Sequence, residues 1–485
     1  MTAASIAASP AAARTRLLLE GPIIATLLRL APANLVVNVI LIAVTASVDA
    51  HFVGQLGIEA LAGLSLVFPP MMLMAQMANA TMGGAIAASV SKAIGAGRRD
   101  DAASLVVHAL VIACAVGALF SAVFVGLGPI LYGWLGGRGP VLAAALDYGN
   151  AIFAGAVIFW LLGALTSAVR GTGQVTVLAW VYLGAEALHI VLVPVLVFGL
   201  GPIPALGATG AGIATIISFA ASSAVLIGYL ASGRTGVTLS LRNIRLRRAM
   251  FGDILKVGIP MSALPLFNNL ALATLTAYAG LLGTTALAGF GIGVRLEYLL
   301  YPINFGLGAG VLAMVGTNIG ARQYERAGQI AWIGTGLSVG VMWLVGVIAI
   351  TAPGLWSGLF TQDPEIRHAT AIFLGVVGMA YVFIAPNTLM SAFQSTRQPQ
   401  FPLLAALSRL VVVAVGGWIA TQLFDASLVG LGIVTFAGLV ALGSVLSLAF
   451  LLYANSLVRK SSSTFSNATR VGSPGSSIKS AVSTE

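Results

Sequence analysis

The sequence has little charge and almost no cysteine. Only 8% of its 485 residues are Asp, Glu, Lys or Arg, 58% are apolar, and the mean hydropathy is +1.00. This balance excludes a soluble globular protein. Cys114 is the single cysteine, so neither a disulfide framework nor a thiolate metal site is available.

Signatures of enzymes are also missing. None of the four lysines follows a glycine, so the chain has no phosphate loop for ATP, and it has no H-E-x-x-H zinc motif. The four histidines are scattered, and we find no nucleophile paired with a base at the membrane interface. We therefore expect no enzyme, no cofactor and no transition-metal site.

Long apolar stretches fill most of the chain. Windows of about 20 residues, the length that crosses a bilayer, predict twelve helices. The 58 glycines favour close packing of these helices, because small residues let backbones approach in lipid. The predicted fold class is all-α, a polytopic membrane protein with helices at residues 28–53, 62–90, 104–126, 147–168, 175–199, 207–231, 253–281, 286–312, 327–352, 368–392, 401–424 and 428–456.

The net charge of +10 comes from basic residues that are unevenly distributed between alternate loops. Twenty of the 24 Lys and Arg residues, Arg170 among them, fall at the termini or in loops on the same side, whereas Arg138 and Arg367 fall in the opposite loops. By the positive-inside rule, both termini are expected in the cytoplasm. The charge then needs no nucleic-acid partner. We expect a monomeric, multi-pass protein of the cytoplasmic (inner) membrane whose partner is membrane lipid.

The sequence contains an internal repeat. Residues 54–63 match residues 280–289 at seven positions in ten, and two further echoes give offsets between 220 and 226 residues. A duplicated six-helix unit predicts two pseudo-symmetric lobes with a cavity between them. The expected division is a disordered N-terminus at 1–16, an N-terminal lobe at 17–235, a basic cytoplasmic linker at 236–252, a C-terminal lobe at 253–457 and a disordered Ser-rich tail at 458–485.

One polar stripe stands out on the first expected span. Asn34, Asn38, Thr45 and Asp49 fall within about 60° of one another on a helix. A carboxylate inside a bilayer is expensive and is a functional-site hypothesis by default. At about 1.5 Å per residue from Arg29, Asp49 lies in the outer half of the membrane. The alternative is an acid that merely sits in the interface before the following turn.

Two other spans carry charge. On the helix expected at 175–199, Glu186 shares a face with Tyr182 and His189. A His about one turn from a Glu can share or relay a proton. The alternative is a hydrogen-bonded pair that fixes helices one and five.

Arg295 and Glu297 lie on the eighth expected helix, two residues apart, so they do not face each other. Glu297 lines up with Tyr301 and Asn304, and each charge needs a partner from another helix. The residues expected to bind a cation are Asp49, Glu186 and His189. The substrate-cavity candidates, which include the suggested partners Asn268, Asn269 and Asn387, are Asn34, Asn38, Thr45, Tyr182, Asn268, Asn269, Thr276, Arg295, Glu297, Tyr301, Asn304 and Asn387.

Several short motifs resemble a known family. They are VDAHFVGQLG at 48–57, ALAG at 60–63, IGAG at 94–97, RGTGQ at 170–174, FGIGVRLE at 290–297 and VGTNIGA at 315–321. In this order, across about residues 20–457, they resemble the multidrug and toxic compound extrusion (MATE) family. The Arg-x-Glu at 295–297, with no acid on the seventh helix, resembles its DNA-damage-inducible-F-like branch.

The resemblance implies two six-helix lobes and a secondary antiporter that expels organic compounds, drugs or toxic metabolites, in exchange for H⁺ or Na⁺. Asp49 matches the family's first-helix carboxylate, which takes part in cation coupling. Family members often have Asn and Asp where this chain has His189 and Val193. Since Na⁺ prefers several hard oxygen ligands, we expect H⁺ coupling, with Na⁺ at Asp49 as the alternative.

Two other functions are weighed against this one. A flippase for lipid-linked saccharide has a related two-lobe architecture, but it is expected to line its cavity with several basic residues, and only Arg295 and Arg409 lie inside the expected spans. A polytopic membrane enzyme would form product without any gradient.

Overall fold

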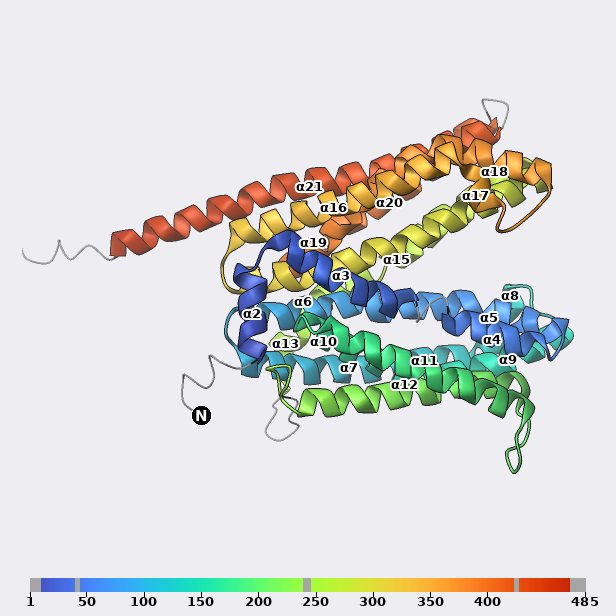
Figure 1. The fold of residues 1–485 in the computed structure, drawn as a ribbon, viewed down its shortest axis with the longest axis horizontal. Coiled ribbons are helices and arrows are strands. Elements are labelled where there is room, and N and C mark those ends of the chain that lie inside the picture. The colour runs from blue at the N-terminus through green and yellow to red at the C-terminus, as the bar shows by residue number, and fades with distance from the viewer. Residues whose placement is uncertain (1–9, 40–43, 239–245, 423–426, 472–485) are drawn as a thin grey trace, which may run out of the picture.

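The computed structural model describes residues 10–39, 44–238, 246–422 and 427–471. Its N-terminal half forms helices that run back and forth along the long axis of the molecule (Figure 1). These elements are α2 (Pro10–Glu20), α3 (Ile23–Val39), α4 (Thr45–Gly54), α5 (Ile58–Gln76), the π-helix η2 (Met77–Thr81), α6 (Met82–Gly95), α7 (Arg99–Gly126), α8 (Gly128–Trp134), α9 (Gly139–Ala154), α10 (Ala156–Gly171), α11 (Val175–Phe198) and α12 (Gly207–Ala231).

The C-terminal half repeats this pattern as a second lobe, in yellow to red in Figure 1. Its elements are α13 (Arg248–Met261), α14 (Leu264–Leu281), α15 (Thr284–Gly320), α16 (Tyr324–Thr351), α17 (Pro353–Ser357), α18 (Pro364–Val377), the 3₁₀-helix η3 (Gly378–Asn387), α19 (Thr388–Thr396), α20 (Gln400–Gln422) and α21 (Leu428–Val471).

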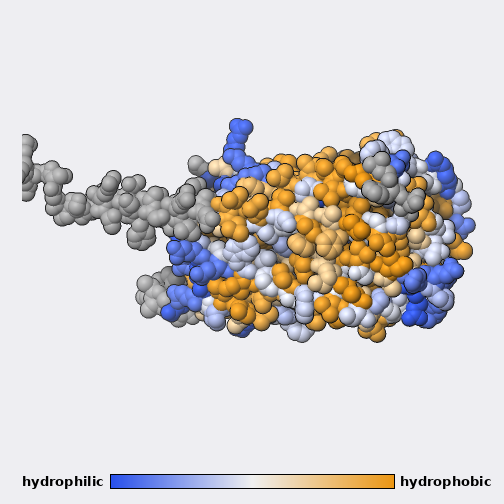
Figure 2. All heavy atoms as spheres, turned by 90° about the horizontal axis from the view of Figure 1, so that it is seen from above, coloured by the Kyte–Doolittle hydropathy of each residue, from blue (hydrophilic) through white to orange (hydrophobic). Residues whose placement is uncertain are grey.

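The lengths and apolar faces of the helices suit a bilayer. Within the described residues, ten helices are long and apolar enough to cross a membrane, or eleven when α9 and α10, bent by 48°, count as one span. Figure 2 shows apolar side chains over the middle of the molecule and hydrophilic ones toward its two ends. The predicted fold class, a twelve-helix membrane protein in two lobes, is confirmed; the expected first span, 28–53, includes residues 40–43, which lie outside the described part.

Several expected spans are broken by local geometry. The expected span at 147–168 bends at Gly155, where a Cβ would lie 2.5 Å from Ile216 of α12. The equivalent span of the second half changes to 3₁₀ geometry from Gly378, whose Cβ would lie 2.8 Å from the carbonyl of Gly346. In both places, close packing that only glycine permits coincides with the break.

The predicted disorder at 1–16 is wrong for its described part. Residues 10–20 form α2, and Leu18 is 2% exposed. Asn318 donates from Nδ2 to the carbonyl of Leu18 at 3.0 Å, and Arg326 donates to the carbonyl of Gly21. These bonds tie the N-terminal segment to the C-terminal lobe. At the other end of the chain, α21 continues to Val471, beyond the expected start of the disordered tail at 458.

The two lobes cross over each other at one end, which we call the terminal end because it carries α2 and the end of α21 (Figure 1). There α3 packs on α15 of the other lobe, and α13 packs on α6. A Cβ on Gly95 would lie 1.9 Å from the carbonyl oxygen of Thr317, so the lobes touch backbone to backbone. Within the C-terminal half, Asp253 and Arg397 form an ion pair of 2.8 Å. Toward the opposite end, α4 and α5 diverge from α17 and α18 in Figure 1.

Candidate functional site

A buried polar cluster lies inside the N-terminal lobe. Asp49 of α4 accepts a hydrogen bond of 2.6 Å from the hydroxyl of Tyr148 on α9. Its other carboxylate oxygen, Oδ1, lies 3.1 Å from Nε2 of His189 on α11. Thr215 of α12 lies 3.1 Å from the same imidazole nitrogen and 3.5 Å from Oδ2 of Asp49. Asp49 is 1% exposed, so the cluster is removed from solvent.

His189 lies between two carboxylates. Its Nδ1 is 3.4 Å from Oε1 of Glu186, one turn earlier on α11, while its Nε2 faces Asp49. A neutral imidazole donates from one nitrogen only, whereas an imidazolium donates from both. With His189 protonated and both carboxylates ionised, the buried cluster carries one net negative charge, which is costly in a low-dielectric site. One further proton would neutralise it, so the arrangement can bind a proton.

The hydroxyl of Thr45 completes the cluster from α4. It donates to Oε2 of Glu186 at 2.9 Å, which links α4 to α11 a second time. The structure thus brings together the three predicted coupling residues and Thr45 from the predicted stripe. Asn34 is also buried and donates to the carbonyl of Leu30 at 3.2 Å. The side chain of Asn38 lies outside the described part of the structure.

Sequence reasoning missed Tyr148 and Thr215. On its helix, each is one of many alternating small, polar and apolar residues. Tyr148 lies 99 residues and Thr215 lies 166 residues from Asp49 along the chain. The internal repeat gave no signal for Tyr148 or Thr215. It showed only that Asp49 has no acidic equivalent in the second half, where the same position holds Leu275, which is buried among apolar side chains.

The C-terminal lobe has a different buried polar cluster. Glu297 of α15 and Arg409 of α20 form an ion pair of 2.6 Å with side chains 6% and 3% exposed. Tyr301 donates to Glu297 at 3.2 Å and accepts from Arg409 at 2.6 Å. The prediction that Asn268, Asn269 or Asn387 would be the partner of Glu297 is therefore wrong. Arg409, on α20 of the same lobe, is a stronger partner for a buried carboxylate than an amide.

The other candidates are scattered. Arg295 is exposed and lies over the ring of Phe360 at 5.3 Å, so it does not line a site with Glu297. Asn304 accepts a hydrogen bond of 2.5 Å from Ser338, and Tyr182 shares one of 3.2 Å with Thr166. The remaining side chains bond to their own helices: Asn269 to Pro265, Thr276 to Leu272 and Asn387 to Ile384. Asn268 is half-buried, and its Oδ1 has no hydrogen-bond partner among the described residues.

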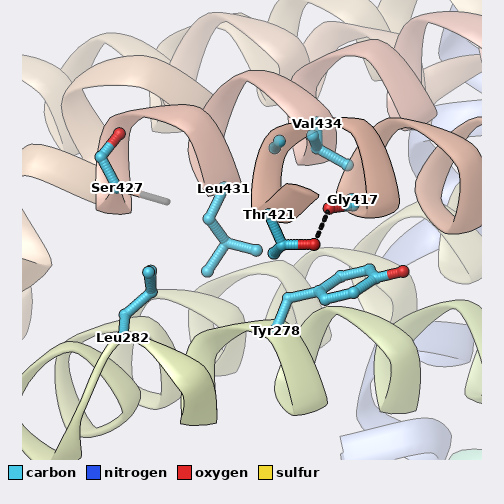
Figure 3. Close-up of a pocket in the computed structure, with 8 residues that line it drawn as sticks. Tyr278, Leu282, Gly417, Thr421, Ser427, Leu431 and Val434 are labelled. Carbon is cyan, nitrogen blue, oxygen red and sulfur yellow. Dashed lines mark hydrogen bonds between the residues drawn. The ribbon is translucent and has the colours of Figure 1, made fainter. Parts of the chain in front are cut away.

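A small pocket between α14, α20 and α21 has a mainly apolar lining (Figure 3). Its polar groups are Tyr278, Ser427 and Thr421, and the Thr421 hydroxyl already donates to the carbonyl of Gly417 at 2.9 Å. The pocket carries no charged residue in its lining, so we do not assign it a coupling role.

Comparisons with known proteins identify relatives. The family model described as MatE matches residues 35–195 and 260–419, and the two segments begin 225 residues apart, within the range of the internal repeat. A FAD transporter of Shewanella oneidensis is 29% identical over 414 residues, which cover 82% of this chain and 87% of that protein. The multidrug export protein MepA of Staphylococcus aureus (strain bovine RF122) is 28% identical over 317 residues, which cover 64% of this chain and 68% of MepA.

A solved structure shows the same fold. The crystal structure of MATE in the bent conformation superposes with a TM-score of 0.84 at 22% sequence identity, covering 93% of this chain and 99% of that one. The family match spans both halves of the chain, and the motif resemblance agrees with it. The chain therefore belongs to the MatE family, a family of multi-pass membrane transporters.

Proposed function

We propose that the protein is a secondary active antiporter that exports organic compounds across the cytoplasmic membrane in exchange for H⁺. The observation that supports the proposal is the buried set of Asp49, His189 and Glu186, in which one imidazole lies within 3.4 Å of two carboxylates. Family membership favours transport over catalysis. Assignment to the DNA-damage-inducible-F-like branch stays a prediction from the Arg-x-Glu motif.

The geometry suggests how proton binding would drive the lobes. Asp49 and Thr45 attach α4 to α9, α11 and α12 through contacts that need an ionised carboxylate as acceptor. A carboxyl group that has taken up a proton donates one hydrogen bond and accepts less strongly. Protonation would therefore release α4 from at least one of these helices. We infer that this release shifts the first span and expels cargo outward.

The contacts between the lobes close the terminal end, as expected of the outward-facing conformation in such a cycle. α3 and α15, and α6 and α13, hold the terminal end together. We propose that this end faces the cytoplasm, as the distribution of basic residues predicts, and that the protein acts as a monomer in the lipid bilayer. Alternating access would then require these two helix pairs to separate.

Na⁺ coupling at Asp49 is the alternative. Oxygens of Asp49, Tyr148 and Thr215 lie together, and oxygen ligands suit hard cations. However, His189 already faces Oδ1 of Asp49 at 3.1 Å, and a protonated imidazole repels a cation. This contact favours H⁺.

The test is transport by the purified full-length chain in proteoliposomes with an organic cation dye as cargo. An imposed pH gradient should drive dye movement at a rate that an equal Na⁺ gradient does not reach. Movement with the Na⁺ gradient alone would contradict H⁺ coupling, and product formation without any gradient would favour the enzyme alternative. FAD is the second cargo to include, since a relative that matches 82% of this chain is named as its transporter.

A further inference from the structure

Arg170 is a buried cation at the junction of the two lobes. It lies near the end of α10 and is 2% exposed, although the sequence alone suggested a loop position. Its Nη1 donates to the carbonyl of Asn79 in η2 at 3.3 Å. Its guanidinium lies 5.2 Å from the ring centre of Phe305, which belongs to α15 of the other lobe. Its Nε has no hydrogen-bond partner in the described part of the chain.

No described carboxylate lies within ion-pair distance of Arg170. Arg409, equally buried at 2% exposed, has Glu297 at 2.6 Å. A buried charge without an opposite charge costs free energy. An unpaired buried charge within a membrane protein is therefore a candidate functional group. The fold therefore satisfies one of these two arginines internally and leaves the charge of the other uncompensated.

The internal repeat holds a neutral residue at the position equivalent to Arg170. Residues 167–174 align with residues 391–398, with Ser, Ala, Thr and Gln in common, and place Arg170 opposite Gln394. Gln394 donates from Nε2 to the carbonyl of Ala80 at 2.9 Å. Both side chains thus bond to carbonyls of the same π-helix, and a neutral amide does so from the C-terminal lobe. A hydrogen bond to this π-helix therefore needs no positive charge; the bond from Arg170 lies within the N-terminal lobe, and the bond from Gln394 crosses between the lobes.

Separation of the lobes at the terminal end would uncover this guanidinium. Arg170 moves with α10, whereas Phe305 moves with α15. Thr166 lies one turn earlier on the same face of α10 and shares a hydrogen bond of 3.2 Å with Tyr182. When Phe305 withdraws, the unpartnered Nε of Arg170 and the two nearby hydroxyls would face the opened space.

We propose that Arg170 receives the anionic group, a phosphate or carboxylate, of an organic cargo as the lobes part at the terminal end. The guanidinium presents paired N–H donors that match such groups. The inference rests on the proposed alternation of the lobes and gives the cargo a chemical class, an organic anion. Arg170 is then a cargo-binding residue of the inner half of the site.

The test uses two probes that share one ring system, riboflavin and riboflavin 5′-phosphate. Binding of each to the full-length protein in lipid nanodiscs is measured by fluorescence, without any gradient. Wild type should bind the phosphate form more tightly. Arg170→Gln, which installs the residue found at the repeat position, should weaken binding of the phosphate form by about tenfold or more and leave riboflavin unchanged.

Gln394→Ala is the matched control, because it removes a bond to the same π-helix without removing charge. It should leave the preference for the phosphate form unchanged. Equal binding of the two probes by wild type, including no binding of either, would overturn the proposal, as would an equal loss of preference in both variants. If Arg170→Gln fails to fold, Arg170→Lys should keep the preference and Arg170→Met should abolish it. Because no gradient is used, failure of H⁺ coupling would leave this result intact.

Discussion

Nε2 of His189 lies 3.1 Å from Oδ1 of Asp49, which joins α11 to α4 through a contact inside the N-terminal lobe. Removing the titratable ring tests whether this contact only holds the two helices together or also binds a proton. His189→Gln keeps a hydrogen-bonding side chain but cannot carry a proton. We expect transport driven by a pH gradient to fall to background, while cargo binding and size-exclusion behaviour stay as in wild type. Full gradient-driven rates in this variant would show that His189 holds no coupling proton.

Tyr148→Phe tests the shortest hydrogen bond to Asp49. The phenol donates at 2.6 Å and favours the ionised carboxylate. Its loss removes a hydrogen bond to a charged group, worth about 1.5–3 kcal/mol, so transport driven by a pH gradient should slow by about tenfold or more. Tyr132→Phe is the control, since the Tyr132 hydroxyl is buried with no partner among the described residues. A wild-type rate in Tyr148→Phe, or equal losses of rate in both variants, would contradict this assignment.

The ion pair between Glu297 and Arg409 should stabilise the C-terminal lobe without coupling transport. Arg409→Met leaves the buried carboxylate of Glu297 without its opposite charge, which should lower the free energy of unfolding by about 3–5 kcal/mol. The double variant with Glu297→Gln should regain part of that loss. Thermal unfolding in detergent measures both. Arg295→Met should have a small effect, because that guanidinium is exposed over Phe360. An Arg409→Met variant as stable as wild type would refute the structural role.

Gly95→Val should prevent closure of the terminal end. Its Cβ would lie 1.9 Å from the carbonyl oxygen of Thr317 on the other lobe, where backbone cannot move aside locally. Spin labels at positions 98 and 322, in a Cys114→Ala background, should show a longer distance than in wild type. Gly328→Val, at a glycine with no atom within 4 Å of its Cβ site, should show no change. An unchanged distance in Gly95→Val would contradict the closed contact.

The fold and part of the site could be predicted from sequence for physical reasons. Apolar windows and the repeat indicated the helices and the two lobes, because bilayer thickness sets span length. Helical periodicity placed Glu186 and His189 together, and the rarity of acids in lipid singled out Asp49. These signals are local to one helix.

Contacts between helices could not be predicted in the same way. Tyr148 and Thr215 join Asp49, and Arg409 joins Glu297, only through packing between distant segments. The sequence also placed Arg170 in a loop, since a basic residue beside a glycine-rich turn is usually exposed, whereas Arg170 is buried and Phe305 of the other lobe lies over its guanidinium. The helical N-terminal segment likewise depends on its bond from Asn318.

The central claim is that Asp49 couples proton movement to cargo movement. The most direct measurement is the flow of H⁺ into or out of proteoliposomes, followed with a trapped pH dye, when only a cargo gradient is imposed. Wild type should move H⁺ opposite to the cargo. Asp49→Asn should move no H⁺ although it still binds cargo. H⁺ movement in Asp49→Asn equal to that in wild type would contradict the mechanism.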